Sequence, residues 1–175
     1  MPEHKLPRLL QLRLGESDTP LELDGLEDTR LALELLSAQA RQELLIHSRE
    51  LDARLLDRRP FLEAVERLCR AHREARVRIL VRDPQAAVRR GHRLLELGRR
   101  LSSHIEFRQP QAEHRQYNEA FLVADGCGYL HRPFADRFEG SANFNDPVQA
   151  RRLADYFTEV WEHAQPHPEL RRLYL

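Results

Sequence analysis

Apolar residues in this chain follow two different spacings, and the alternation between them limits the possible folds more than any other feature. Short apolar runs, such as residues 44–47 and 77–81, have the length of buried strands. Longer segments between them carry apolar residues every three or four positions. The first spacing is typical of strands and the second of amphipathic helices. Strands that alternate with helices of this length predict an α/β layered domain.

The expected elements can be placed along the chain. Strands are expected over residues 10–14, 21–23, 44–47, 77–81, 105–107, 121–124 and 129–131. Helices are expected to begin near residues 28, 60, 84 and 147, where capping residues or prolines occur, and the third should run to about residue 102. Residues 109–118 are polar and contain proline, which indicates a loop. Because residues 125–128 have the turn chemistry of a hairpin, the sheet should be mixed rather than purely parallel.

Length and composition predict one domain over residues 1–175. A chain of 175 residues with 41% apolar content can bury a real core but is short for two domains. Within it we expect N-terminal strands in residues 8–24 and a C-terminal tail over residues 165–175. No apolar run approaches the roughly 20 residues of a membrane span, and the N-terminus lacks a signal-peptide core, so we expect a cytoplasmic protein.

Metal and cofactor sites are not predicted. Two cysteines are too few for a disulfide framework, so reduced thiols are expected. His163 and His167 have a ligand-like spacing of four, but Pro166 should end the helix between them. Motifs for zinc, dinucleotides and nucleoside triphosphates do not occur in the sequence. We therefore expect no cofactor and no metal.

Charge is balanced overall but unevenly distributed. The chain has 28 bases and 28 acids, yet residues 41–115 carry 18 bases against 11 acids, a net charge of +7. Arg89, Arg93 and Arg100 fall on one face of the expected third helix. This face is either a solvated surface or a surface that contacts nucleic-acid phosphates without sequence specificity. Few aromatic residues are interleaved there, which argues against single-strand binding.

One motif carries a family resemblance. Residues 140–144 read Gly-Ser-Ala-Asn-Phe, after an apolar strand that ends in Asp125 and before a helix with Phe157 and Trp161. This order resembles the C-terminal half of a phospholipase D-like domain, whose signature is H-x-K-x4-D followed by G-S-x-N. The similarity covers about residues 28–164. It implies a phospholipase D/nuclease-like fold, with a mixed β-sheet flanked by helices.

The resemblance also implies a chemistry, in which a histidine attacks phosphorus and lysine and asparagine stabilise the phosphoryl oxygens. Asp125 corresponds to the aspartate that orients the imidazole, and Ser141 and Asn143 correspond to phosphate-side residues. Asn118 stands where the family has its nucleophilic histidine, and Ala120 where it has lysine. An amide is no nucleophile at neutral pH, and losing one member of such a unit costs roughly 10⁴–10⁶ in rate. The resemblance therefore implies a degenerate site.

Three histidines are candidates for a remaining role. His114 precedes the strand that ends in Asp125, and His131 lies on the return strand of the hairpin, so either is a candidate catalytic residue together with Asp125. His47 ends its strand, the position where ligands bind in open α/β sheets, and is a candidate phosphate contact. Each has a structural alternative: a solvated loop histidine, a partly buried strand histidine, and a satisfied histidine at a strand end.

Three functional hypotheses follow. The first is a catalytically degenerate phospholipase D-like domain that serves as a binding or scaffold module for a phosphate-containing ligand or a protein partner. The second is a divergent phosphodiesterase or nuclease that uses His114 or His131. The third is non-specific nucleic-acid binding through the arginine-rich face. The resemblance further implies a possible homodimer, because active relatives of this size pair two motif halves in one site.

Overall fold

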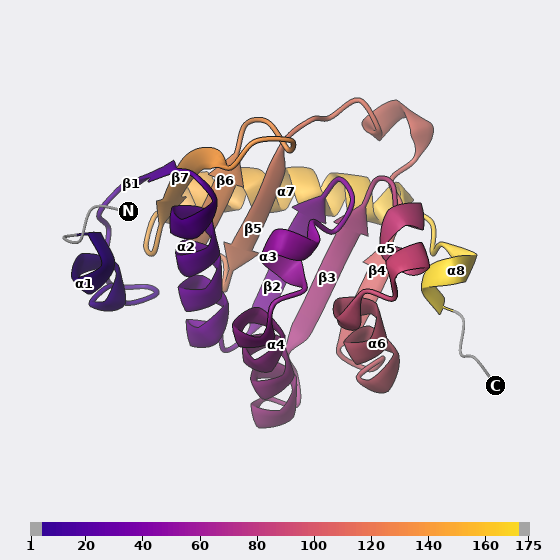
Figure 1. Ribbon diagram of the computed structural model, residues 1–175, viewed down its shortest axis with the longest axis horizontal. Helices are drawn as coiled ribbons and strands as arrows, with labels where there is room; N and C mark the ends of the chain where they lie inside the picture. The colour runs from indigo at the N-terminus through magenta and orange to yellow at the C-terminus, as the bar shows by residue number, and fades with distance from the viewer. Residues whose placement is uncertain (1–4, 172–175) are drawn as a thin grey trace.

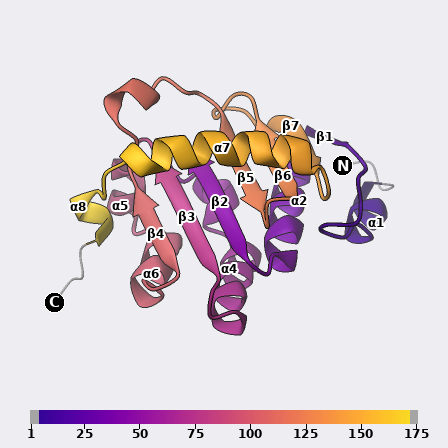
Figure 2. The same ribbon diagram turned by 180° about the vertical axis from the view of Figure 1, so that it is seen from behind.

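A mixed seven-stranded sheet forms the centre of the molecule, and helices cover both of its faces (Figures 1 and 2). The computed structural model describes residues 5–171. The strands follow the spatial order β1-β7-β6-β5-β2-β3-β4, and only β2, β3 and β4 run parallel to their sequential neighbours. Their bounds are β1 Leu21–Asp24, β2 Glu43–Ser48, β3 Arg76–Val81, β4 Ile105–Arg108, β5 Ala120–Ala124, β6 Gly128–Arg132 and β7 Glu139–Asn143. This arrangement confirms the predicted α/β fold with a mixed sheet.

Two separate cores lie on the two faces of the sheet. Helices on the first face are α2 (Leu26–Gln39), α3 (Ala53–Leu56), α4 (Arg59–Ala71), α5 (Gln85–Arg90) and α6 (Arg93–Arg100), as Figure 1 shows. The second face is crossed by α7 (Pro147–His163), which lies in front in Figure 2. Strand β2 is buried on both sides because its side chains alternate between the two cores, with Ile46 on the first and Leu45 on the second. This explains its continuous apolar run.

The prediction of an N-terminal strand at residues 10–14 is wrong. Residues Lys5–Leu10 form the short helix α1, and the chain then turns toward β1. Leu9 and Leu12 are the buried residues, whereas Leu10 is 51% exposed. A spacing of three between buried positions fits a helical turn rather than a strand. The seventh strand is instead β7, which contains the Gly-Ser-Ala-Asn segment.

The expected third helix is divided into α5 and α6. Gly91 adopts the left-handed conformation, with φ of 66°, and ends α5. His92 then begins α6, because its Nδ1 accepts a hydrogen bond from the backbone N–H of Leu94 at 3.2 Å. The arginines of this region therefore lie on two helices rather than on one continuous face. Three further short helices went unpredicted: α3, before the expected second helix, η1 (Ala112–His114), in the expected loop, and α8 (Pro168–Arg171), in the expected tail.

Candidate functional site

Strand register brings several of the predicted site residues into one row across the sheet. Cross-strand neighbours point to the same face, with Cβ atoms about 5 Å apart. Ser141 of β7 pairs with His131 of β6, which pairs with Phe121 of β5, which pairs with His47 of β2. Phe121 packs in the core beneath α7, so the whole row faces that helix. His131 and Ser141 are thus neighbours in space, and His47 lies beyond Phe121 in the same row, although all three are distant in sequence.

His47 is buried, with 3% of its surface exposed. Its Nδ1 donates a hydrogen bond to the backbone carbonyl of Glu119 at 3.1 Å, which leaves Nε2 as the acceptor of a neutral imidazole. That Nε2 is buried and has no hydrogen-bond partner among the described residues. Burial lowers the pKa of His47 to about 4, so the ring is neutral at physiological pH.

Glu119 lies at the centre of the polar contacts around this row. Its carboxylate accepts a hydrogen bond from the Tyr117 hydroxyl at 2.8 Å and one from His131 Nε2 at 2.5 Å. Burial acts to raise the pKa of Glu119, but these two hydrogen bonds outweigh it and hold the pKa below its usual value. The carboxylate is therefore ionised and fixes the orientation of the His131 ring.

Aromatic rings cover His47. Phe121 stacks on its ring at 5.3 Å, and Tyr117 meets the ring edge-on at 5.0 Å. Tyr156 of α7 stacks on Tyr117 with ring centroids 4.2 Å apart. His114 of η1 approaches Tyr156 at 6.5 Å, so the loop before β5 also reaches this cluster. We call His47, Tyr117, Glu119, His131 and Tyr156 the imidazole cluster.

Asn118 and Ala120 lie at the start of β5, where Asn118 precedes the strand and Ala120 is its first residue. Asn118 accepts a hydrogen bond on its side-chain oxygen from Arg82 at 3.0 Å, and its backbone carbonyl accepts one from the N–H of Ala135 at 2.8 Å. Ala120 pairs with Arg132 of β6. Arg132 is 5% exposed, and burial lowers the pKa of its guanidinium. A neighbouring strand thus places a buried cation beside Ala120.

That guanidinium is used to hold a loop. Arg132 donates from Nη1 to the carbonyl oxygens of Ala135 at 3.3 Å and Arg137 at 2.7 Å. The Thr29 hydroxyl donates to the carbonyl of Phe138 at 2.6 Å, and the Arg54 guanidinium lies 4.6 Å from the centre of the Phe138 ring. The segment 133–138, which we call the covering loop, is therefore fixed against the Asn118 end of β5.

Asp125 and Asn143 are not brought to this region. Asp125 lies at the other end of β5, about 13 Å along the strand from the residue that pairs with His131. Its carboxylate accepts three backbone hydrogen bonds, at 2.8–3.0 Å, from the N–H groups of Arg41, Gln42 and Glu43. The aspartate thus joins the end of β5 to the start of β2. The sequence had instead predicted that it would orient an imidazole.

The Gly-Ser-Ala-Asn segment also has structural roles. It lies on β7, and β6 separates it from β5. A Cβ on Gly140 would lie 2.2 Å from the carbonyl oxygen of His131, so the close approach of two strands requires this glycine. Asn143 is buried, donates to the carbonyl of Asp18 at 3.2 Å and accepts from the N–H of Asn145 at 3.0 Å. The segment matches the G-S-x-N signature in sequence, but β6 lies between it and β5, the strand that follows Asn118.

Sequence reasoning missed Tyr117 and Glu119. Both were assigned to or beside a polar loop, yet with Phe121 they continue a period of two into β5. That alternation was the available signal. In the part of the chain that the structure describes, no group of three or more histidine, cysteine or acidic side chains is arranged to hold a metal ion. No helix between residues 5 and 171 is long and apolar enough to span a membrane.

Comparison with solved structures defines the class of fold. Nuc from Salmonella typhimurium, a phospholipase D family member, matches with a TM-score of 0.61 at 10% identity, over 85% of this chain and 99% of its own. NucT from Helicobacter pylori matches with a TM-score of 0.56 at 10% identity, over 86% and 98% of the two chains. The fold is therefore of the phospholipase D/nuclease type.

A third structural relative is larger. TrmBL2, an archaeal chromatin protein whose structure shows a novel mode of DNA binding, matches with a TM-score of 0.63 at 12% identity. The match covers 93% of this chain, which spans 59% of the TrmBL2 chain. At these identities the three likenesses establish the fold alone.

Sequence comparison gives the family. The chain belongs to the family described as a domain of unknown function, DUF7931, whose model matches residues 26–173. A search of curated proteins finds no match.

Proposed function

We propose that this protein is a phospholipase D-like domain without phosphoryl-transfer activity, which serves as a binding or scaffold module. The carrying observation is the state of the Asn118 end of β5. Asn118 and Ala120 stand at the positions of the attacking imidazole and the cation, and the covering loop is hydrogen-bonded there through Arg132 and the Asn118 carbonyl. The side chains at this end bond to one another, which supports a role other than turnover.

For a phosphate-containing ligand, the proposed contacts are Ser141 and His131, which supply a hydroxyl and an imidazole at adjacent positions of the sheet. His47 lies beyond Phe121 in the row and is covered by Tyr117 and Tyr156. It would contact such a ligand only after these rings move. Asp125 and Asn143 lie at the other edge and are assigned to the scaffold.

The test is a turnover assay with purified protein. Bis(4-nitrophenyl) phosphate, phosphatidylcholine vesicles and duplex DNA are each incubated with the protein, alongside a known phosphodiesterase as positive control. We expect no product above the buffer background. Hydrolysis that disappears in a His131→Ala variant would overturn the proposal in favour of a divergent enzyme.

A divergent phosphodiesterase is the second candidate, and the Glu119–His131 pair favours it. An imidazole oriented by an ionised carboxylate is the arrangement that activates a nucleophile or base. His114 is the other candidate, on the far side of Tyr156. Trapping a phosphohistidine with labelled substrate, and losing it in His131→Asn but not in His114→Asn, would establish this reading. If no phosphohistidine formed with any of the three substrates, the phosphodiesterase hypothesis would be rejected.

Non-specific nucleic-acid binding is the third candidate, favoured by the +7 charge of residues 41–115. Two arginines of the expected basic face are paired within the fold, since Arg93 pairs with Asp57 at 2.6 Å and Arg100 lies 3.8 Å from Glu66, both acids being already counted in that net charge. Arg89 and Arg90 end α5 and remain the proposed phosphate contacts. A duplex DNA gel shift that weakens with salt and is lost in Arg89→Gln/Arg90→Gln is expected for this function. A shift that ignores salt would contradict it.

Self-association belongs to the same proposal. If two copies form the module, sedimentation at micromolar concentration should give a dimer mass. A monomer mass at every concentration would confine the scaffold role to a heterologous partner.

A further inference from the structure

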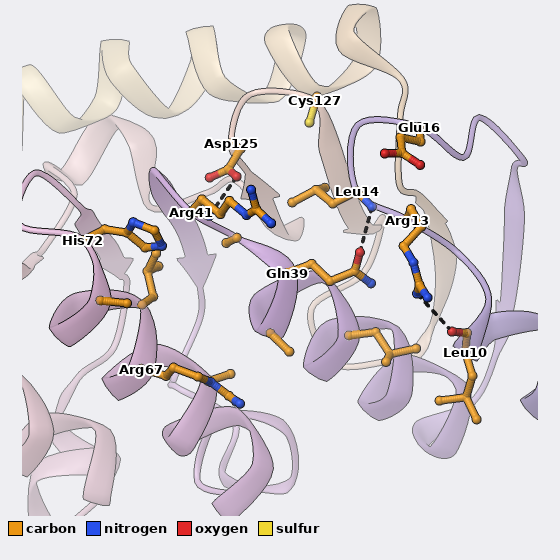
Figure 3. Close-up of a pocket in the computed structure, with 16 residues that line it drawn as sticks. Leu10, Arg13, Leu14, Glu16, Gln39, Arg41, Arg67, His72, Asp125 and Cys127 are labelled. Carbon is orange, nitrogen blue, oxygen red and sulfur yellow. Dashed lines mark hydrogen bonds between the residues drawn. The ribbon is translucent and has the colours of Figure 1, made fainter.

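A groove of about 730 Å³ lies at the edge of the sheet opposite the Asn118 end of β5. Figure 3 shows the residues around it, which come from the N-terminal segment 10–16, the last turns of α2 and α4, and the hairpin turn that carries Asp125 and Cys127. Its volume lies within the roughly 300–1,000 Å³ of small-molecule sites. None of the functions discussed above uses it.

One wall of the groove is firmly attached. The Gln39 side chain of α2 accepts a hydrogen bond from the N–H of Leu14 at 2.8 Å and donates one to the carbonyl of Leu12 at 3.1 Å. The N–H of Gly15 donates to the carbonyl of Phe144 at 2.8 Å. The N-terminal segment is therefore anchored to both α2 and the end of β7, and the groove is a built feature of the fold.

Guanidinium groups without acidic partners line this groove. Arg41, which follows α2, and Arg67 of α4 both line the groove (Figure 3), and neither has a carboxylate within 4.0 Å among the described residues. Asp125 is close in space, but its oxygens accept the three backbone N–H groups of residues 41–43. Arg13 donates to the carbonyls of Leu10 and Leu12 at 3.4 Å. Glu16 is the other acidic residue in the lining.

Apolar side chains provide the remaining surface. Leu10 is 51% exposed at the rim, and Leu14 and Leu35 are half-buried along the wall. Single exposed leucines are ordinary on protein surfaces, but here they border a concave site that also holds unpaired cations. Arginine recognises carboxylates and phosphates through two parallel hydrogen bonds. The lining thus presents a cationic end and an apolar wall.

We propose that this groove binds a small amphipathic anion, with a carboxylate or phosphate head between Arg41 and Arg67 and a short apolar chain along Leu10, Leu14 and Leu35. The two heads share the same recognition chemistry, and the experiment separates them. Because the groove lies at the opposite edge from the imidazole cluster, this site stands independently of the function proposed above.

The test is a calorimetric titration of the full chain with three probes of equal chain length: octanoate, octyl phosphate and octanol. Octanoate or octyl phosphate is expected to bind saturably, and octanol at least tenfold more weakly. Since a hydrogen bond to a charged group contributes about 1.5–3 kcal/mol, Arg41→Gln and Arg67→Gln should each raise the Kd about tenfold or more. The matched control is Arg70→Gln, also on α4, whose guanidinium pairs with Glu66 outside the groove. Its Kd should be unchanged.

Each outcome decides the proposal. Tighter binding of octanoate identifies a carboxylate site, and tighter binding of octyl phosphate identifies a phosphate-ester site. Equal affinity for octanol, an equal effect of the Arg70→Gln control, or no saturable binding below about 10 mM, well beyond millimolar Kd values, would overturn it. Loss of turnover or of DNA binding has no bearing on this result, which keeps the two proposals separable.

Discussion

At the edge of the sheet where β2, β3 and β4 end, polar side chains bond to one another. At the opposite edge, arginines that have no carboxylate partners line an open groove. At the first edge, the Glu119 carboxylate accepts hydrogen bonds from both Tyr117 and His131. Arg41 and Arg67 face the groove at the second. Ligands in open α/β sheets usually bind at the carboxyl ends of the strands. In this protein the charged and hydroxyl groups of the imidazole cluster at that edge bond to one another, and the groove lies at the other edge.

The largest effect that tests this contrast concerns the buried imidazole of His47. Its pKa is about 4 in the folded protein, against about 6.5 in an unfolded chain, because burial disfavours the charged ring. Between these values the unfolded chain binds the additional proton, so the free energy of unfolding falls as the pH drops from about 6.5 to about 4. The full loss is about 3 kcal/mol.

Urea denaturation at pH 7 and at pH 4 measures this loss. Carboxylates also titrate in that range, and burial lowers the pKa of His92 as well, so the comparison is made with a His47→Gln variant. The variant should be less sensitive to pH than the wild type by about 3 kcal/mol. If the stability of the variant and of the wild type depended equally on pH, the His47 ring would be accessible to water rather than buried in the imidazole cluster.

Asp125 gives the next largest effect and tests its assignment to the scaffold. Asp125→Ala removes the acceptor of three backbone hydrogen bonds and places alanine at a φ of 51°. We expect a loss of about 2 kcal/mol in the free energy of unfolding. Asp125→Asn keeps one acceptor oxygen and tolerates the left-handed conformation, so its loss should be smaller. Two variants of unchanged stability would show that the carboxylate is free for another role.

Much of the fold was predictable because it depends on local patterns. The run 44–47 and the turn chemistry of residues 125–128 correctly placed β2 and the hairpin of β5 and β6. The strand prediction for residues 10–14 failed because it used the alternation of leucines alone. The buried residues are Leu9 and Leu12, which have a helical spacing. Strand β7 was missed because Gly140 and Ser141 have low strand propensity, and only the pairing with β6 and β1 makes the segment extended.

The site was less predictable, because it depends on the register between strands. Matching letters placed Asn143 and Asp125 beside Asn118, whereas the intervening strand β6 and the length of β5 move both to the other edge. The alignment of His47, His131 and Ser141 in one row follows from three strand pairings that no local pattern contains. Cross-strand register is a tertiary property, and a match to a short motif does not determine it.

A smaller effect is expected for the hydrogen bonds of Glu119. Glu119→Gln preserves the shape of the side chain but removes the charge that His131 and Tyr117 contact. We expect a loss of about 1 kcal/mol. A double-mutant cycle with Tyr117→Phe should give a coupling energy of similar size, since the two groups share one hydrogen bond. Zero coupling would mean that the hydrogen bond contributes nothing to the stability of the cluster.

The smallest effect concerns the groove. Arg41→Gln and Arg67→Gln should each change the free energy of unfolding by less than about 0.5 kcal/mol, because exposed side chains without partners contribute little to stability. Chemical denaturation in buffer without small organic anions measures this. Unchanged stability together with weakened octanoate or octyl phosphate binding would assign these arginines to recognition rather than to folding. A loss near 2 kcal/mol would instead show that each guanidinium already has a partner within the folded chain. The contrast between the two edges would then disappear, since both would be internally satisfied.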